Sequence, residues 1–191
     1  MEIVVKDLCK RYGGQPVLDG VSFTAGSGVT CIMAPSGAGK TTLLRILMGL
    51  ESPDSGTITG LAGRRLSVVF QEDRLLDHLD ARGNLRFVLG PAYREQEAQD
   101  LLAELGLTPE EGKPVRDWSG GMRRRLALIR ALLVPFDVLV LDEPFTGLDE
   151  ENRRRCRTCI LRRAAGKTVL LVTHDAADAA GLDAEILTLT P

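Results

Sequence analysis

No stretch of this sequence is apolar over the length needed to cross a membrane, and no charged-then-apolar leader begins it. These absences predict a soluble protein that remains in the cytoplasm. A basic surface is lacking too, because 24 Lys and Arg stand against 26 Asp and Glu, a formal net charge of −2. We therefore expect no nucleic-acid partner. With 191 residues, 44% of them hydrophobic, the chain is predicted to form one well-buried domain that can accommodate an inserted subdomain.

Metal-ligating residues are also few. The only histidines are His78 and His174, and the four cysteines include the pair Cys156-x-x-Cys159. This spacing is compatible with a metal or redox site, but a four-ligand zinc site would be poorly supplied. Cys156 and Cys159 also share one helix face with Ile160. We therefore interpret the pair as core residues.

A glycine-rich loop between a buried strand and a helix is the most informative local pattern. An apolar run at 29–33 predicts the strand, and apolar residues at helical spacing from 43 predict the helix. Between them come Ala34, Pro35, Ser36, Gly37, Ala38, Gly39, Lys40, Thr41 and Thr42. Small side chains leave the backbone N–H groups free to surround an anion, and the N-terminus of the helix favours negative charge. This is a P-loop, a device that holds nucleotide phosphates.

Three residues of the loop have specific expectations. Lys40 is predicted to contact the terminal phosphates, and the Thr41 hydroxyl is placed to ligate Mg²⁺. Ala34 stands where the motif has glycine. If this position required a positive φ, alanine would cost about 1–2 kcal/mol. If it required only a small side chain, the cost would be slight.

Polar residues follow three other apolar strands. Gln71, the pair Asp142 and Glu143, and His174 each come directly after such a strand. Open α/β sheets place ligands at the carboxyl ends of their strands, so we expect these side chains to meet near the phosphate loop. Asp142 would hold Mg²⁺ directly or through water, and Glu143 would orient and deprotonate an attacking water. A lone histidine is usually structural, so His174 is a catalytic candidate only because the other polar residues also follow apolar strands.

A second glycine-bearing helix start lies at 118–122. Ser119, Gly120 and Gly121 can present a hydroxyl and bare N–H groups to an anion at the positive end of a helix dipole. A second phosphate cradle indicates another nucleotide, one that a partner subunit binds. The arginines at 123–125 are predicted on the exposed polar face of this helix.

The remaining patterns give an α/β organisation with an inserted helical part. The acidic segment 72–117 holds eleven Asp and Glu against six Lys and Arg and reads as helical, with a helix predicted over 93–105. Continuous apolar strands at 137–142 and 167–173 are typical of a parallel sheet covered on both faces. Further helices are expected at 119–134 and 150–165, and shorter strands at 2–5, 20–23, 57–59, 66–70 and 185–189.

With these motifs in hand, the chain resembles the nucleotide-binding subunit of an ATP-binding cassette (ABC) transporter over residues 3–189. The family's motifs occur in the family's order: Tyr12 as the aromatic that stacks on adenine, 34–42 as the P-loop, Gln71 as the Q-loop, 118–122 as the signature loop written LSGGQ, 138–143 as the Walker B strand, 146–149 as the D-loop and His174 as the switch histidine. Ala34, Trp118 and Met122 depart from the family pattern, but none of them removes a charged or catalytic group.

The resemblance implies a P-loop NTPase of the ABC ATPase type: a mostly parallel sheet core, a small antiparallel β subdomain and an inserted α-helical subdomain. The core would comprise 1–71 and 135–191, and the helical subdomain 72–134. ATP and Mg²⁺ are the implied cofactors, with ATP hydrolysis as the activity. The implied catalytic residues are Lys40, Gln71, Glu143 and His174, the implied metal ligands are Thr41, Gln71 and Asp142, and Tyr12 and Asp149 join the two glycine-bearing loops as nucleotide contacts.

The implied partners follow from the same resemblance. Two such subunits, identical or paralogous, would sandwich two ATP molecules, with Ser119 and Gly121 of one facing the γ-phosphate held by Lys40 of the other. The groove beside Gln71 would receive a short helix of an integral membrane permease, so the protein would sit on the cytoplasmic face of the membrane. The segment 70–76 is similar to importers of nitrate, taurine and sulfonates, which implies import of a small solute and a solute-binding protein as a further partner.

Two other readings use the same motifs. An ABC ATPase that maintains DNA would place a long coiled coil between Q-loop and signature loop, but 47 residues without a sustained heptad separate Gln71 from Ser119. The kind that acts on ribosomes normally joins two cassettes in one chain. A regulatory nucleotide-binding module without turnover is the other alternative, against which Glu143 and His174 argue.

Overall fold

The computed structural model describes residues 2–35, 37–108 and 112–188. Its elements are β1 (Ile3–Tyr12), β2 (Gln15–Ala25), β3 (Gly28–Met33), α1 (Lys40–Leu47), β4 (Ser55–Thr59), β5 (Leu66–Val69), α2 (Ala81–Leu89), the 3-10 helix η1 (Gly90–Ala92), α3 (Glu95–Glu104), the 3-10 helix η2 (Val115–Asp117), α4 (Gly120–Leu133), β6 (Val138–Asp142), α5 (Glu150–Arg163), β7 (Thr168–Val172), α6 (Ala176–Ala180) and β8 (Glu185–Thr188). Leu189, the predicted end of the last strand, lies outside the described residues.

A parallel sheet with the strand order β5-β6-β7-β3-β8 forms the centre of the molecule. Every residue of β6 is buried. Val138 and Val140 contribute to an apolar cluster with α1 and β1, whereas Leu139 and Leu141 contribute to the cluster on the other face with α4 and α5. Alternate side chains of a strand point to opposite faces, so a strand covered on both faces has a continuous apolar sequence.

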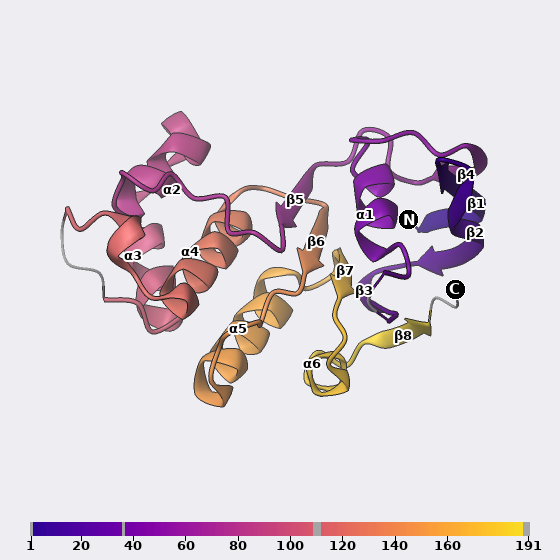
Figure 1. The fold of residues 1–191 in the computed structure, drawn as a ribbon. Helices are drawn as coiled ribbons and strands as arrows, with labels where there is room; N and C mark the ends of the chain where they lie inside the picture. The colour runs from indigo at the N-terminus through magenta and orange to yellow at the C-terminus, as the bar shows by residue number, and fades with distance from the viewer. Residues whose placement is uncertain (1, 36, 109–111, 189–191) are drawn as a thin grey trace.

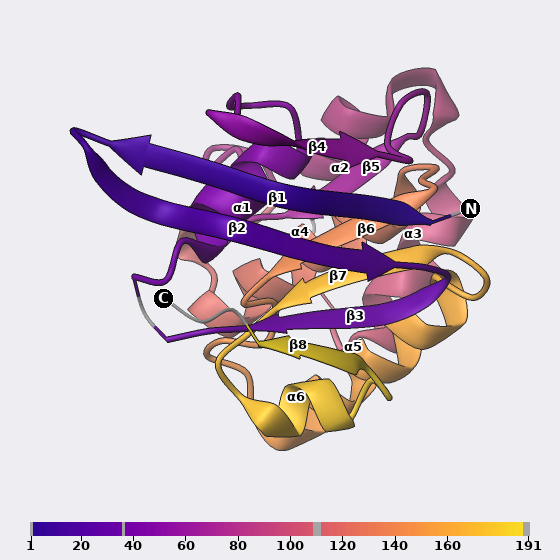
Figure 2. The ribbon, with the colours of Figure 1, turned by 90° about the vertical axis from the view of Figure 1, so that its right-hand side faces the viewer.

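A smaller antiparallel sheet, ordered β2-β1-β4, packs beside α1 (Figure 1). The predicted strands at 2–5 and 20–23 were too short, because β1 and β2 form a long hairpin (Figure 2). Gly13 and Gly14 turn the chain in two residues, with φ of 56° and 85°, as a tight hairpin turn requires. The polar residues on both sides of this turn resemble a loop in sequence although they pair as strands.

The helices of the acidic segment gather at one end of the sheet, beyond β5 (Figure 1). The helix predicted over 93–105 is α3, and the helix predicted from 119 is α4, which Ser119 caps by accepting a hydrogen bond from the N–H of Met122. Leu101, Leu105 and Leu126 are fully buried where α3 and α4 pack together. Among the described residues, no helix is long and apolar enough to span a bilayer.

Two of the three arginines predicted on the exposed face of α4 are buried, so that prediction was wrong for them. Arg124 is 4% and Arg125 8% exposed, and each guanidinium donates to main-chain carbonyls. Arginine has five donors on a long stem, so it can occupy a buried position when unpaired carbonyls surround it. The expectation for Cys156 and Cys159 is confirmed: both lie in the core, where burial raises the pKa of the thiols to about 12 and about 11.

Candidate active site

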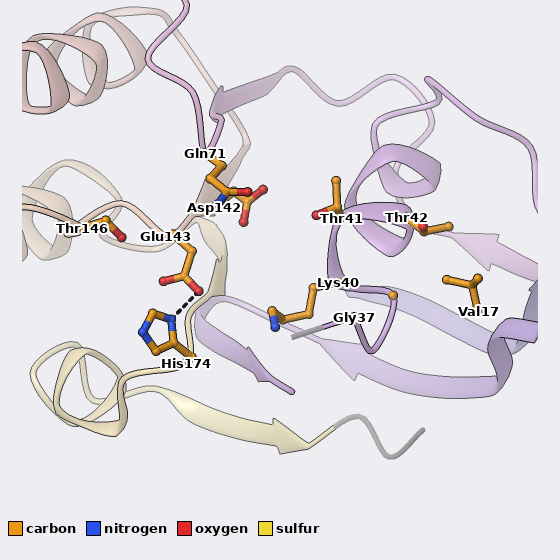
Figure 3. Close-up of a pocket in the computed structure, with 11 residues that line it drawn as sticks. Val17, Gly37, Lys40, Thr41, Thr42, Gln71, Asp142, Glu143, Thr146 and His174 are labelled. Carbon is orange, nitrogen blue, oxygen red and sulfur yellow. Dashed lines mark hydrogen bonds and ion pairs between the residues drawn. The ribbon is translucent and has the colours of Figure 1, made fainter. Parts of the chain in front are cut away.

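A pocket of about 510 Å³ opens at the carboxyl ends of the parallel strands (Figure 3). The loop before α1 and its first residues form one side, and residues that follow β5, β6 and β7 form the other. Its lining consists of Val17, Gly37, Gly39, Lys40, Thr41, Thr42, Gln71, Asp142, Glu143, Thr146 and His174. The structure therefore brings the predicted strand-end residues together beside the glycine-rich loop. Val17 of β2 also lines the pocket, a contribution that the sequence did not reveal because Val17 lay outside the strands predicted at 2–5 and 20–23.

The path of the loop depends on glycine at one position. Gly39 has a φ of 83°, and a Cβ there would lie 2.5 Å from the carbonyl oxygen of Val17. Ala34, by contrast, is buried and is not one of the described non-glycine residues with positive φ. The departure from the motif at Ala34 therefore brings no backbone strain of this kind. Ser36 lies outside the described residues.

Lys40 is the cation of this loop. Its Nζ donates hydrogen bonds to the carbonyl oxygens of Ala34, at 2.7 Å, and Pro35, at 2.9 Å. These contacts keep the ammonium group beside the loop, and Figure 3 shows it pointing into the pocket toward Glu143. An ammonium group next to free backbone N–H groups at a helix N-terminus is suited to bind phosphate.

Glu143 and His174 form a pair across the ends of β6 and β7. The His174 Nδ1 and the Glu143 Oε1 are 2.8 Å apart. The hydrogen bond to Glu143, and then its negative charge, raise the pKa of His174. Glu143 itself has a φ of 48°, a left-handed conformation that costs free energy for a non-glycine residue and occurs often at functional sites. The pair thus places a carboxylate, oriented by an imidazole, at the edge of the pocket.

Asp142 offers a site for a cation. Its side chain is 8% exposed and makes no hydrogen bond or salt bridge with the other described residues. Burial, and then the neighbouring Glu143, raise the pKa of its carboxyl group. Figure 3 shows it beside Gln71, with the Thr41 hydroxyl across the pocket. These oxygen donors suit Mg²⁺, which commonly takes the rest of its ligands from water and phosphate. No group of three or more His, Cys, Asp or Glu among the described residues could hold a metal alone.

Four other predicted nucleotide contacts line a separate hollow of about 660 Å³. Ser119, Gly120, Gly121 and Asp149 all line it, and none of them lines the P-loop pocket. Asp149 caps α5, since its carboxylate accepts a hydrogen bond from the backbone N–H of Asn152 at 2.8 Å. Gln71 and Thr146 line both hollows. The predicted residues therefore fall into two neighbouring groups within one chain.

Tyr12 lies outside both hollows. Its side chain is among the exposed apolar ones, its hydroxyl donates to Glu51, and the Nζ of Lys10 is 5.6 Å from the centroid of its ring. Tyr12 neighbours the P-loop pocket through Thr42, whose side chain contributes to its electrostatic environment and lines that pocket. Its role as a platform for adenine stays a prediction.

The fold and the pocket define a P-loop nucleotide-binding protein of the α/β class. The sequence model of the ABC transporter family matches residues 18–146, and the chain belongs to that family. The sequence is 41% identical over 187 residues to the aliphatic sulfonates import ATP-binding protein of Rhodococcus jostii, which covers 94% of this chain and 76% of that protein. The predicted family resemblance and fold class are thus confirmed.

Other relatives extend the comparison. The sulfate/thiosulfate import ATP-binding protein of Mycobacterium bovis is 40% identical over 195 residues, 93% of this chain and 55% of the relative. The Nod factor export ATP-binding protein of Ralstonia nicotianae is 43% identical over 190 residues, 89% of this chain and 58% of the relative. This chain thus spans little more than half the length of these two proteins.

Solved structures agree on the fold. The ATP-binding subunit of an ABC transporter superimposes with a TM-score of 0.86 at 26% identity, over 99% of this chain and 86% of the other. A bacterial ABC transporter cassette described as dimeric gives a TM-score of 0.83 at 27% identity, over 98% of this chain and 94% of the other.

The raised pKa of His174 predicts a pH dependence. Because the folded pKa lies above the ordinary value of 6.5, the pair with Glu143 stabilises the fold below about pH 6.5, and this contribution is lost as pH rises through the folded pKa. In Glu143→Gln, which removes the charge, NMR titration of the imidazole should give a pKa closer to the ordinary value. Glu150→Gln, which removes a surface partner of Arg157, should leave the His174 titration unchanged. A His174 pKa that is equal in Glu143→Gln and the parent would contradict this electrostatic account.

The backbone at Ala34 predicts that Ala34→Gly changes nucleotide affinity little, since no left-handed strain is available to be relieved. Calorimetric titration with ATP would measure this. In the matched variant Gly39→Ala, the new Cβ would meet the Val17 carbonyl and the positive φ would be strained, so binding should be lost. A tenfold gain in Ala34→Gly would correspond to about 1.4 kcal/mol of strain and would show that the loop conformation is misjudged.

Proposed function

We propose that this chain is the ATP-hydrolysing subunit of a transporter that imports a small solute through a separate membrane permease. The shared pocket carries the proposal: the loop with Lys40 lies opposite the Glu143–His174 pair and the buried Asp142. An anion-binding loop beside a carboxylate base is what phosphoryl transfer to water requires. Relatives named for sulfate and sulfonate import support the direction of transport. One relative is named for export, so the direction also rests on the importer-like segment 70–76.

The loop side of the pocket binds ATP in this proposal. Lys40 and the backbone N–H groups of the loop hold the terminal phosphates, with Thr42 and the small residues around it closing on the α- and β-phosphates. Thr41, Asp142 and Gln71 hold Mg²⁺, which when bound neutralises phosphate charge. The buried Asp142 carboxylate, without a cationic hydrogen-bond partner among the described residues, supports this assignment.

The opposite side of the pocket provides the base. Glu143 accepts a proton from the attacking water, and Nδ1 of His174 fixes the orientation of its carboxylate. Because the pKa of His174 is raised, the imidazole keeps its proton to higher pH and offers a positive charge near the transferring phosphate. The other oxygen of the Glu143 carboxylate, Oε2, lies 3.4 Å from the Thr173 hydroxyl.

A second subunit, identical or paralogous, completes each site. Ser119, Gly120, Gly121 and Asp149 line a hollow distinct from the pocket of Lys40, which supports their serving a nucleotide held by the other copy. The bare N–H groups at the start of α4 and the Ser119 hydroxyl then face the γ-phosphate. The solved relative described as dimeric supports this arrangement.

The permease docks where the two parts of the chain meet. We assign 1–71 and 135–191 to the ATP-binding core and 72–134 to a helical subdomain. A hollow of about 150 Å³ beside Gln71 is lined by Phe70, Glu72 and Arg74 together with residues of α1, and it suits a short permease helix. The subunit would thus be held at the cytoplasmic face of the membrane, and a solute-binding protein would deliver the solute.

Action on nucleic acid finds no support in the arginine-rich helix α5. Its arginines are engaged with carboxylates of the same chain: Arg153 with Asp175, Arg154 and Arg155 with Glu151, Arg157 with Glu150, Arg162 with Glu104 and Arg163 with Glu97. A surface whose cations already have partners gains less from binding phosphates.

Replacing Glu143 tests the catalytic proposal. Glu143→Gln keeps the shape but removes both the base and a negative charge beside the phosphates, so ATP should bind as well or better while phosphate release stops. Because the second subunit closes only on an intact γ-phosphate, this variant should accumulate as an ATP-bound dimer. Sizing chromatography with ATP and Mg²⁺ measures the dimer, and a phosphate-release assay measures turnover. Hydrolysis near the parent rate would mean that another group is the base.

The control for the dimer is Ser119→Arg in the same background. The large side chain would fill the second hollow, so the dimer should be lost while ATP still binds each monomer. If Glu143→Gln is inactive yet monomeric with ATP, the result agrees with Glu143 as the base but contradicts a site shared between two subunits.

The docking proposal is tested by crosslinking. In a Cys9→Ser background the other native cysteines are buried, so a single cysteine at Arg74, an exposed residue of the hollow beside Gln71, should crosslink to the membrane subunit of a cognate complex. A cysteine at Arg154, on the exposed side of α5, is the matched control and should not. Crosslinks from the cysteine at Arg154 alone would contradict this docking site and place the permease at the surface of α5.

A further inference from the structure

A single buried guanidinium joins α4 to the ends of two strands. Arg124 Nη1 donates to the carbonyl oxygens of Phe70, at 2.6 Å, and Gln71, at 3.2 Å. Nη2 donates to the carbonyl oxygens of Asp142, at 2.7 Å, and Glu143. The carboxylate of Asp73 lies 3.2 Å from Nη1. Both ends of the fork therefore contact the segments that deliver side chains to the pocket.

These carbonyls need an outside donor because the strands part there. β5 and β6 pair in register up to Val69 and Leu141, where the ladder between these two strands ends. The carbonyls beyond that point lose their ladder partners, and buried carbonyls without partners are costly. The planar, five-donor group of arginine can bridge two diverging strands, which a single ammonium group cannot do.

The contact with Glu143 bears on the reactive carboxylate. Glu143 has left-handed backbone geometry, which persists only where its surroundings enforce it. Three contacts hold its peptide groups: its N–H donates to the carbonyl oxygen of Val172 at 2.8 Å, and its carbonyl accepts from Arg124 and, at 3.4 Å, from the N–H of Thr146 in the same turn. The Val172 contact comes from the sheet, whereas the Arg124 contact comes from a helix whose first turn carries Gly120 and Gly121.

We propose that Arg124 is a positioning residue for hydrolysis, which fixes the backbone of Glu143 and Gln71 and makes that geometry depend on where α4 lies. The inference rests on the proposed function, because it takes Glu143 as the base. Movement of α4 against the sheet would then disturb the base directly, through one side chain. Arg125, its neighbour, bonds instead to Leu105, Gly106 and Asn152, so this link belongs to Arg124.

Arg130 provides a matched control on the same helix. Its guanidinium donates to the carbonyl oxygens of Arg74, at 2.6 Å, and Asp73, at 2.9 Å. It is therefore a partly buried arginine that satisfies carbonyls of the same loop without touching Glu143 or Gln71. A purely structural need for arginine on α4 would affect both positions.

Steady-state ATP hydrolysis separates the two roles. In Arg124→Gln we expect kcat to fall about tenfold or more while KM for ATP stays within about twofold, because the loop that binds ATP is untouched. Arg124→Lys, which keeps the charge but bridges less, should lie between this variant and the parent. Arg130→Gln should keep a kcat near that of the parent, even if its melting temperature falls as much as that of Arg124→Gln.

A second measurement needs no ATP. Hydrogen exchange of the Glu143 amide, followed by NMR, should be about tenfold faster in Arg124→Lys than in the parent, while exchange of the Val140 amide in the preceding strand β6 changes little. A general loss of stability would speed both amides alike. In Arg130→Gln the ratio of the exchange rates of the Glu143 and Val140 amides should equal that of the parent.

Each outcome decides one question. If the parent releases no phosphate, the proposed function fails, while the exchange of the Glu143 amide still tests Arg124. If the parent is active and Arg124→Gln keeps its kcat, the positioning role is wrong. It is equally wrong if Arg130→Gln loses as much kcat, if the Glu143 and Val140 amides accelerate together, or if Arg124→Lys does not fold at all, because each result describes a purely structural residue.

Discussion

The parallel pairing of β5, β6, β7 and β3 is the constraint on which the pocket depends. Parallel strands end at one edge of a sheet, and the register sets Leu141 beside both Val69 and Leu171. The residues that follow these positions therefore arrive together, although they lie far apart in the sequence. The carboxyl end of β3 delivers the glycine-rich loop to the same edge. Geometry common to all such sheets thus brings the glycine-rich loop, the buried Asp142 carboxylate and the Glu143–His174 pair to one pocket.

Covering both faces of this sheet has an electrostatic consequence. The apolar clusters that bury β6 along its whole length leave its last residue, Asp142, almost without solvent, and this burial raises the pKa of its carboxyl group. The same layers leave strand-end carbonyls in need of donors, which a buried arginine provides. Core packing and site chemistry are therefore one arrangement: the apolar layers that stabilise the sheet also make its polar edge responsive to charge.

The sequence predicted what local pattern and strand order determine. Apolar runs located the buried strands, and the glycine-rich loop with Lys40 located one side of the pocket. Periodicity could not reveal that Arg124 and Arg125 are buried, because it describes a helix face and not the carbonyls that face it from distant segments. The β1–β2 hairpin was underestimated since the strand residues beside its turn are exposed and give no apolar pattern. The sequence did assign Ser119 to a second phosphate cradle apart from Lys40, and the structure places the two residues in different hollows.

The left-handed backbone of Glu143 implies a conflict between stability and activity at a single position. Glycine or asparagine would adopt a φ of 48° at lower conformational cost than glutamate, yet neither carries a carboxylate. Under the proposed function, selection for thermal robustness alone would thus favour replacing this residue, and only selection for turnover would retain it. A screen of random variants for heat resistance, made without regard to activity, should therefore enrich inactive proteins altered at this position.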